Sequence, residues 1–311
     1  MKLRAGLSPA VGLVLLSGLW AFGWLLPDLL PQFGTRTVSL PVGESILFTA
    51  FAAITAFIAK MQRLEFPRGR HAWTGAGIGV GLFVVPAGAA AFARGWVSNF
   101  DEVAVLCLTP VFAVVLEPYL QDNPPRKGKA ALAGALVAIA GILCLLPIET
   151  PGSFRGGAAL VVLLVAAIVL AATNCIAVRL ASTDSGQSSL TLAAQAGGAS
   201  AILFAMIAAA TRSAAWDSSA AEIYILRLFL VDIPGLFLLF WLMRRLSATR
   251  MAARFLVAPL LASLAGLALE RTLPPLRGLL GIALLAGGSG WLVFAPAESE
   301  ERFTLSADSV E

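Results

Sequence analysis

Five ionisable side chains lie inside long apolar stretches of this 311-residue chain. They are Glu44, Glu117, Arg227, Asp232 and Arg254. A charged group at the centre of a membrane-spanning helix costs roughly 2.5–3.5 kcal/mol unless it faces protein or water. Groups kept at such a cost bind or conduct polar solutes and ions, or they hold helices together as ion pairs. These five residues are therefore the first candidates for binding and gating.

Their depths along the apolar stretches predict two pairs and one single acid. Glu44 and Arg227 are expected in the outer third of the membrane, and Glu117 and Arg254 in the inner third. Asp232 is expected near the midplane. In this hypothesis the outer pair and the inner pair form contacts that close the two sides in turn, while Asp232 faces a substrate between them. The alternative is that these charges only hold the bundle together, or that the inner pair reaches the interface by snorkelling.

Uncharged polar and aromatic side chains extend the candidate substrate site. Trp20 and Trp24 lie one helical turn apart and share a face, where they could line a cavity and attract a cation. Asn174 and Gln195 are expected at mid-depth. The alternatives are packing and an interfacial belt for the tryptophans, and helix-to-helix hydrogen bonds for the two amides.

The sequence contains no signature of an enzyme or of an ATP-driven pump. The single histidine, His71, stands in a basic loop, so neither a nucleophile–histidine pair nor a histidine-based metal cluster can be assembled. No glycine-rich phosphate loop with a following Lys-Ser or Lys-Thr is present. Cys107, Cys144 and Cys175 fall in apolar runs and are expected to pack as small residues. We expect no catalytic residue, no metal and no cofactor, and any proton coupling would depend on Asp232 or Glu44.

The composition is that of a polytopic membrane protein. Hydrophobic residues make up 59% of the chain and charged residues 13%, with a mean hydropathy of +0.87. Soluble domains have roughly a quarter of their residues charged. The net charge of +4 resides in short loops and therefore indicates membrane topology rather than a nucleic-acid partner.

Ten apolar segments, each near the roughly 20 residues that a helix needs to cross a bilayer, predict ten transmembrane helices. They span approximately residues 9–30, 37–60, 72–93, 99–120, 128–147, 156–181, 187–211, 219–243, 247–269 and 276–295. Pro110, Pro118, Pro234 and Pro259 are expected to weaken the fourth, eighth and ninth of these helices.

A duplicated pattern divides the chain into two halves. Pro110 is followed by PPRKG at residues 124–128 and an apolar run to Pro147, and Pro259 is followed by PPLRG at residues 274–278 and an apolar run to Pro296. We therefore predict a first five-helix repeat over residues 1–150 and a second over residues 151–297. The acidic segment 298–311 is expected to be a disordered cytoplasmic tail.

The distribution of positive charge predicts the orientation. Most of the 22 lysines and arginines fall on one side of the predicted topology, which places both termini in the cytoplasm. Five helices per half is an odd number, so the second half would insert upside down. The predicted fold is an all-α membrane protein with ten transmembrane helices in two inverted five-helix repeats.

Several short motifs resemble those of the drug/metabolite transporter superfamily, EamA type. The similar segments are VLCLTPVF at 105–112, LSATRMAA at 246–253 followed by APLL at 258–261, Leu269-Glu270 with Gly278, and LWAFG at 19–23. They occur in order over nearly the whole chain. The resemblance implies a ten-helix secondary carrier, often an exporter of amino acids, other metabolites or drugs. Two departures from the family pattern are Glu44, where such chains often carry arginine, and Gln121 or Asp122 at the position matching Glu270.

These observations favour a secondary transporter, an exporter, for a small polar or zwitterionic metabolite such as an amino acid. It is expected in a bacterial inner membrane, as a monomer or homodimer, with protons as a candidate coupling ion. An amino acid would place its amino group against a carboxylate and its own carboxylate against Arg227. The alternatives are an exporter of cationic amines or drugs, and a membrane scaffold that transports nothing.

Overall fold

The computed structural model describes residues 7–29, 39–120, 128–146, 152–182, 188–212, 224–270 and 274–294. Within these ranges, ten helical segments are long and apolar enough to cross a membrane. Their limits agree with the expected segments to within a few residues, and no strand occurs in the described part of the chain. Large apolar side chains such as Val161, Val165 and Ile168 are exposed along one of these helices, as expected where the solvent is lipid. The protein is an all-α integral membrane protein with ten spans.

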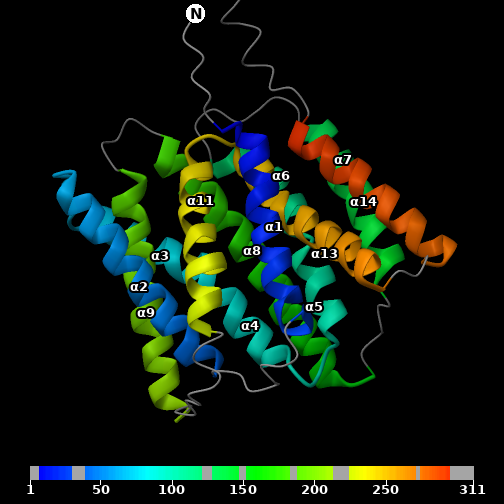
Figure 1. Cartoon of the computed structure of the whole chain (residues 1–311), viewed down its shortest axis with the longest axis horizontal. Helices are drawn as coiled ribbons and strands as arrows, with labels where there is room; N and C mark the ends of the chain where they lie inside the picture. Colours follow the sequence, from blue (N-terminus) through cyan, green and yellow to red (C-terminus); the bar gives the residue numbers. More distant parts are fainter. Residues whose placement is uncertain are drawn as a thin grey trace, which may run out of the picture.

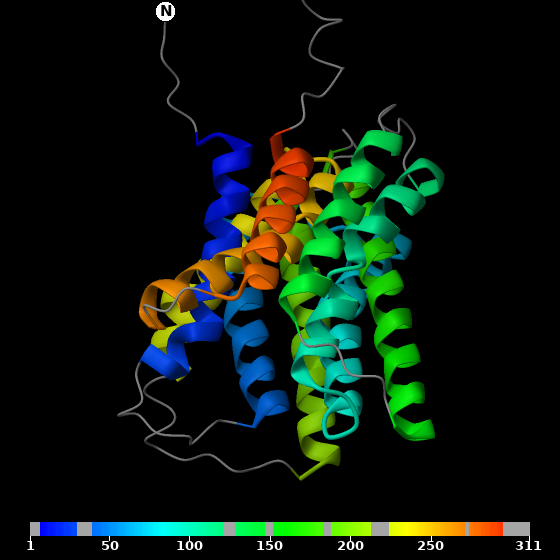
Figure 2. The same ribbon diagram turned by 90° about the vertical axis from the view of Figure 1, so that its right-hand side faces the viewer.

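The helices follow one another as α-helices and two π-helical turns, named η. Their bounds are α1 (Pro9–Leu29), α2 (Leu40–Met61), α3 (Arg70–Gly79), η2 (Val80–Val84), α4 (Val85–Ala93), α5 (Asn99–Leu106), α6 (Thr109–Leu120), α7 (Gly128–Leu145), α8 (Phe154–Ser182), α9 (Ser189–Ala210), η3 (Leu228–Asp232), α11 (Ile233–Met243), α12 (Ala248–Ala252), α13 (Arg254–Glu270) and α14 (Leu276–Phe294). The start of α1 and the end of α14 lie at the same end of the bundle (Figure 2). The tail 298–311 lies outside the described residues.

In the described part of the chain four spans are interrupted, namely the third, the fourth, the eighth and the ninth. The third span contains η2 and the eighth contains η3, and in each case a proline, Pro86 or Pro234, follows two residues after the π-turn. A proline inside a helix has no N–H to donate and its ring clashes with the preceding turn, so the backbone shifts to i→i+5 bonding. The fourth span breaks between α5 and α6, and the ninth breaks between α12 and α13.

Side chains replace the helical bonds that prolines remove in the broken spans. Pro110 leaves the carbonyl of Leu106 without its i+4 donor, and the hydroxyl of Thr109 donates to that carbonyl at 2.6 Å. Pro259 leaves the carbonyl of Phe255 without its i+4 donor, and the Cys107 thiol donates to that carbonyl at 3.0 Å. The Cys107 bond links the break of the fourth span to the ninth span. The cysteine expected only to pack therefore also satisfies a backbone carbonyl.

Helix contacts repeat when each span is exchanged with the span five places along. α2 packs along α9, and α7 along α14, on opposite sides of the molecule (Figure 1). The contacts of α8 with α4 and α6 recur as the contacts of α1 with α11 and α13. The contact of α3 with α9 recurs as that of α11 with α2.

Glycines bring α7 and α14 into backbone contact. A Cβ on Gly141 would lie 2.7 Å from the Gly281 carbonyl oxygen, and one on Gly288 would lie 2.5 Å from that of Gly134. Because Gly134 meets Gly288 and Gly141 meets Gly281, the two helices run antiparallel. Small residues at such positions permit close packing where lipid supplies no hydrophobic driving force.

We expect Gly288→Ala to destabilise the protein by about 1–3 kcal/mol, because the added methyl group would overlap the Ala138 amide nitrogen. The neighbouring Gly287 provides the control, since nothing lies within 4 Å of a Cβ at that position. Gly287→Ala should leave stability unchanged or raise it slightly through helix propensity. Thermal unfolding in detergent measures both variants, and equal midpoints would show that the α7–α14 contact is looser than described.

Candidate functional site

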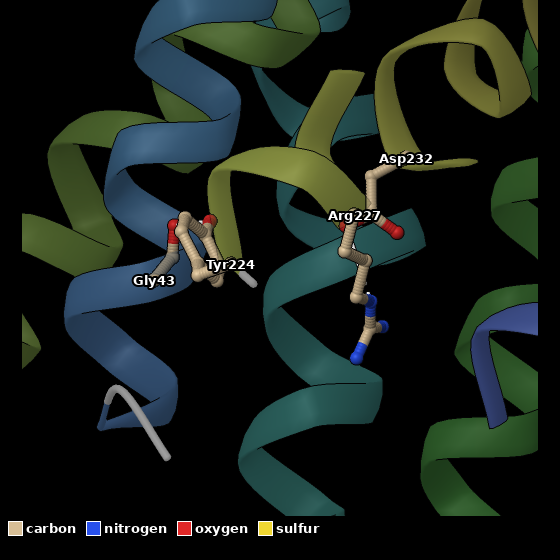
Figure 3. Close-up of polar contacts among 4 residues, drawn as sticks. All are labelled: Gly43, Tyr224, Arg227 and Asp232. Atoms are coloured by element: carbon tan, nitrogen blue, oxygen red, sulfur yellow. Dashed lines mark hydrogen bonds and ion pairs between the residues drawn. The ribbon is translucent and has the colours of Figure 1, made fainter. Parts of the chain in front are cut away.

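The first polar cluster is built on the π-turn of the eighth span. The Arg227 Nε atom lies 3.3 Å from Asp232 Oδ2 (Figure 3). In an α-helix, residues five apart are rotated by roughly 140° and face different directions. The π-turn between them has its closing bond from the Ile233 N–H to the Leu228 carbonyl, five residues back. This winding brings residue i+5 over residue i, so the ion pair depends on the π-turn.

The second helix completes this cluster. Tyr224 donates its hydroxyl hydrogen to the Gly43 carbonyl, and a Cβ on Gly43 would lie 3.1 Å from the tyrosine ring (Figure 3). Glu44, the next residue, interacts electrostatically with Asp232 and Arg227. The absence of a side chain at position 43 thus lets the tyrosine ring approach α2 closely. We call Glu44, Tyr224, Arg227 and Asp232 the outer cluster.

The structure differs from the expected ion pair between Glu44 and Arg227. Arg227 pairs with Asp232 on its own helix, whereas Glu44 lies nearby without forming the direct ion pair that we expected. Asp232 is consequently not a single acid between two closed pairs. The three charged groups form one cluster with two acids and one base.

The second set of polar groups surrounds the short helix α12. Glu117, on α6, is 1% exposed and accepts hydrogen bonds from the amides of Ala248 at 3.0 Å and Thr249 at 3.3 Å, and from the Thr249 hydroxyl. The first amides of a helix have no intrahelical partner, and a carboxylate also interacts favourably with the helix dipole there. Glu117 therefore joins the fourth span to the start of the ninth span.

Arg254 lies at the other end of α12, directly after the break. Its side chain is 1% exposed; Nη1 donates to the Met251 carbonyl at 2.7 Å and Nη2 donates to Asn174 Oδ1 at 3.0 Å. The guanidinium also lies over the rings of Phe255, at 4.6 Å, and Trp20, at 5.4 Å. We call Arg254, Asn174 and Trp20 the inner cluster.

The expected Glu117–Arg254 contact is not formed in this structure. The two side chains bind opposite ends of α12, and the partners described for Arg254 are a carbonyl, an amide and two rings. Sequence depth placed the two charges correctly near each other in the fold, but the five-residue helix between their contact points separates them.

The remaining predicted residues divide between the clusters and other surroundings. Trp20 contacts Arg254, and Trp24, one turn further along α1, is 50% exposed. Asn174 is fully buried beside Arg254. Gln195 donates to the Pro67 carbonyl at 3.2 Å and packs against Gly75, which places it beside the loop before α3 rather than at mid-depth.

α1 runs past both clusters. A Cβ on Gly23 would lie 3.9 Å from Arg227 Nε, and Trp20, one turn earlier, contacts Arg254. Residues three apart share a helix face, so one face of α1 borders the outer and the inner cluster. Tyr224 was missed in the sequence; the signal was that one of only two tyrosines stands three residues before Arg227.

Comparison with known proteins supports the fold and leaves the family open. No model of a protein family matches the chain, and no curated protein matches it. A solved structure, named only as a crystal structure of a protein, has a TM-score of 0.73 at 17% identity. The match covers 93% of this chain and 99% of the other. At this identity the likeness concerns the fold alone.

Proposed function

We propose that this protein is a secondary active transporter that exports a small polar or zwitterionic metabolite, such as an amino acid, by alternating access. The carrying observation is that the interrupted spans are the third, fourth, eighth and ninth, and that these spans carry four of the five in-span charges. Discontinuous helices at corresponding positions of two repeats form the binding sites of many carriers.

Two observations support an inverted relation between the halves, which this mechanism requires. The helix contacts recur on exchanging spans five apart, and α7 and α14, the last spans of the two halves, run antiparallel. Two such halves can rock against each other around a fixed site and expose it to either side. The proposal includes both termini in the cytoplasm, a bacterial inner membrane and the EamA-type family.

The charge of the outer cluster favours a substrate with an amino group. Two carboxylates, Glu44 and Asp232, surround one guanidinium, Arg227. When both acids are ionised the cluster carries one net negative charge, which an ammonium group or a proton can neutralise. This composition also supports the second candidate, a carrier of cationic amines. In both candidates the amino group of the substrate would lie against the carboxylates of Glu44 and Asp232, as we expected from the sequence for an amino acid.

The transport test uses purified protein in liposomes, a radiolabelled mixture of the twenty amino acids, and an imposed pH gradient. We expect accumulation that exceeds that of empty liposomes. Asp232→Asn should lower the initial rate roughly ten- to a hundredfold, because a charge-assisted interaction contributes about 1.5–3 kcal/mol.

The control is Asp101→Asn, which neutralises a buried carboxylate in the capping box that begins α5. This variant should transport at the wild-type rate. Uptake of amines in place of amino acids would select the second candidate. Absence of uptake for both classes in either gradient direction would reject the transporter proposal.

A further inference from the structure

The inner cluster contains a buried positive charge with no acidic partner among the residues that the structure describes. Arg254 is 1% exposed, and its described contacts are the Met251 carbonyl, Asn174 Oδ1 and the rings of Phe255 and Trp20. A guanidinium stays protonated in proteins. The negative end of the short helix α12 and the two rings stabilise this charge only in part. A buried ion usually has a counter-ion, because desolvation is costly.

Two hydrogen-bond donors in this cluster have no acceptor. They are Arg254 Nε and Asn174 Nδ2, both buried. The orientation of the Asn174 amide follows from chemistry, because a guanidinium only donates and must face the amide oxygen. The amide nitrogen is then left free. Unpaired buried donors are rare in native structures, and a pair of them on two side chains in contact indicates an absent acceptor.

A single ligand that satisfies both donors and balances the guanidinium accepts two hydrogen bonds and carries one negative charge. A carboxylate has two oxygens and a single charge, which matches one guanidinium. A phosphate monoester carries a charge of about −1.5 to −2 and would leave buried negative charge in the cluster. The surroundings, Trp20 and Phe255, are aromatic and supply no further cation.

We propose that Arg254 and Asn174 form a carboxylate-binding subsite, with Trp20 beside it. The inference rests on the proposed transport function and narrows its substrate to solutes with a carboxylate. It reassigns the carboxylate of an amino acid from Arg227, which Asp232 already neutralises, to Arg254. The amino group would then face the outer cluster along the same side of α1.

The first test needs only the wild-type protein. Thermal unfolding in detergent is measured with the twenty amino acids, with benzoate, with the matched amides L-phenylalaninamide and benzamide, and with inorganic phosphate. A ligand that binds the folded state raises the unfolding midpoint with its concentration. We expect a rise with at least one carboxylate and none with its amide. No rise with any carboxylate, equal rises with acid and amide, or a rise with phosphate alone would overturn the proposal.

The second test puts a carboxylate on the protein itself. Asn174→Asp supplies the missing counter-ion, so we expect a higher midpoint without ligand and roughly ten- to a hundredfold weaker binding of the carboxylate found in the first test. Thr173→Val is the control, because the adjacent Thr173 hydroxyl already donates to the Val169 carbonyl at 2.7 Å. If Asn174→Asp binds the carboxylate as tightly as wild type, Arg254 serves only the helix break, and the subsite is rejected.

The two proposals can fail separately. Carboxylate binding that Asn174→Asp removes, without any uptake into liposomes, would keep the subsite and reject the transporter. Uptake that proceeds equally in wild type and Asn174→Asp would keep the transporter and reject the subsite.

Discussion

Replacing Glu117 by alanine should lower the free energy of unfolding by roughly 2–5 kcal/mol, the largest loss that we expect from any single polar side chain. The change leaves the amides of Ala248 and Thr249 and the Thr249 hydroxyl without their acceptor in the protein interior. Each unsatisfied buried donor costs about 1–3 kcal/mol. Glu117→Ala also removes one of the polar contacts between the fourth and the ninth span. Thermal or chemical unfolding in detergent, followed by tryptophan fluorescence, measures the loss.

Two further variants test whether the lost hydrogen bonds cause the loss of stability. Glu117→Gln keeps one accepting oxygen and should lose less than Glu117→Ala. Glu102 lies in the first turn of α5 and is only partly buried. Its carboxylate interacts with the start of a helix, as that of Glu117 does, so Glu102→Ala is the control and should cost less than about 1 kcal/mol. Equal losses for Glu117→Ala and Glu102→Ala would mean that the buried cap contributes no more than a surface charge.

The number and limits of the spans could be predicted from sequence because hydrocarbon imposes a single requirement on each of them. A helix of about 20 apolar residues satisfies its backbone internally, whatever its neighbours are. The limits of the fourth span, 99–120, agree with those of the structure for this reason. Pro110 also predicted the break of the fourth span, since a missing N–H is a property of the residue alone. In the ninth span the break precedes Pro259, which lies inside α13.

The pairing of the charges could not be predicted, because it depends on backbone departures from the α-helix. Depth was counted at the regular rise of an α-helix, which puts Arg227 and Asp232 on different faces. The π-turn η3 brings the two side chains onto the same face of the helix. In the same way, the break after α12 turns Arg254 back toward the Met251 carbonyl, and so away from Glu117. The π-turn and the break both lie beside a charged residue. A regular α-helix therefore gives the wrong direction for these side chains, and with it the wrong partners.

The two π-turns differ in one informative respect. η2 and η3 occupy corresponding places, each two residues before a proline, yet η2 has the sequence VGLFV and η3 has LFLVD. In η2 the close approach is made by Gly81, where a Cβ would overlap the Thr173 hydroxyl oxygen. The same backbone device therefore packs helices in the first half and positions an ion pair in the second.

This difference leads to the prediction with the largest expected effect on transport. Pro234→Ala restores the N–H that the proline lacks, so the eighth span can return to α-helical bonding and the Arg227–Asp232 pair separates. We expect the transport rate in the liposome assay to fall roughly ten- to a hundredfold, the effect of losing a charge-assisted contact. Stability should stay the same or rise by about 1 kcal/mol, since a helical hydrogen bond is gained. A variant that is more stable and less active would separate the role of the turn in function from its role in folding.

Pro86→Ala is the matched control, because it removes the corresponding proline beside a π-turn that carries no charge. If the outer cluster is what transport requires, Pro86→Ala should retain most of the wild-type rate. If both proline variants lose transport equally, the two turns act as hinges of the two halves, and the ion pair is secondary. If Pro234→Ala transports at the wild-type rate while its unfolding midpoint rises, neither the π-turn nor the pair that it creates is needed for transport.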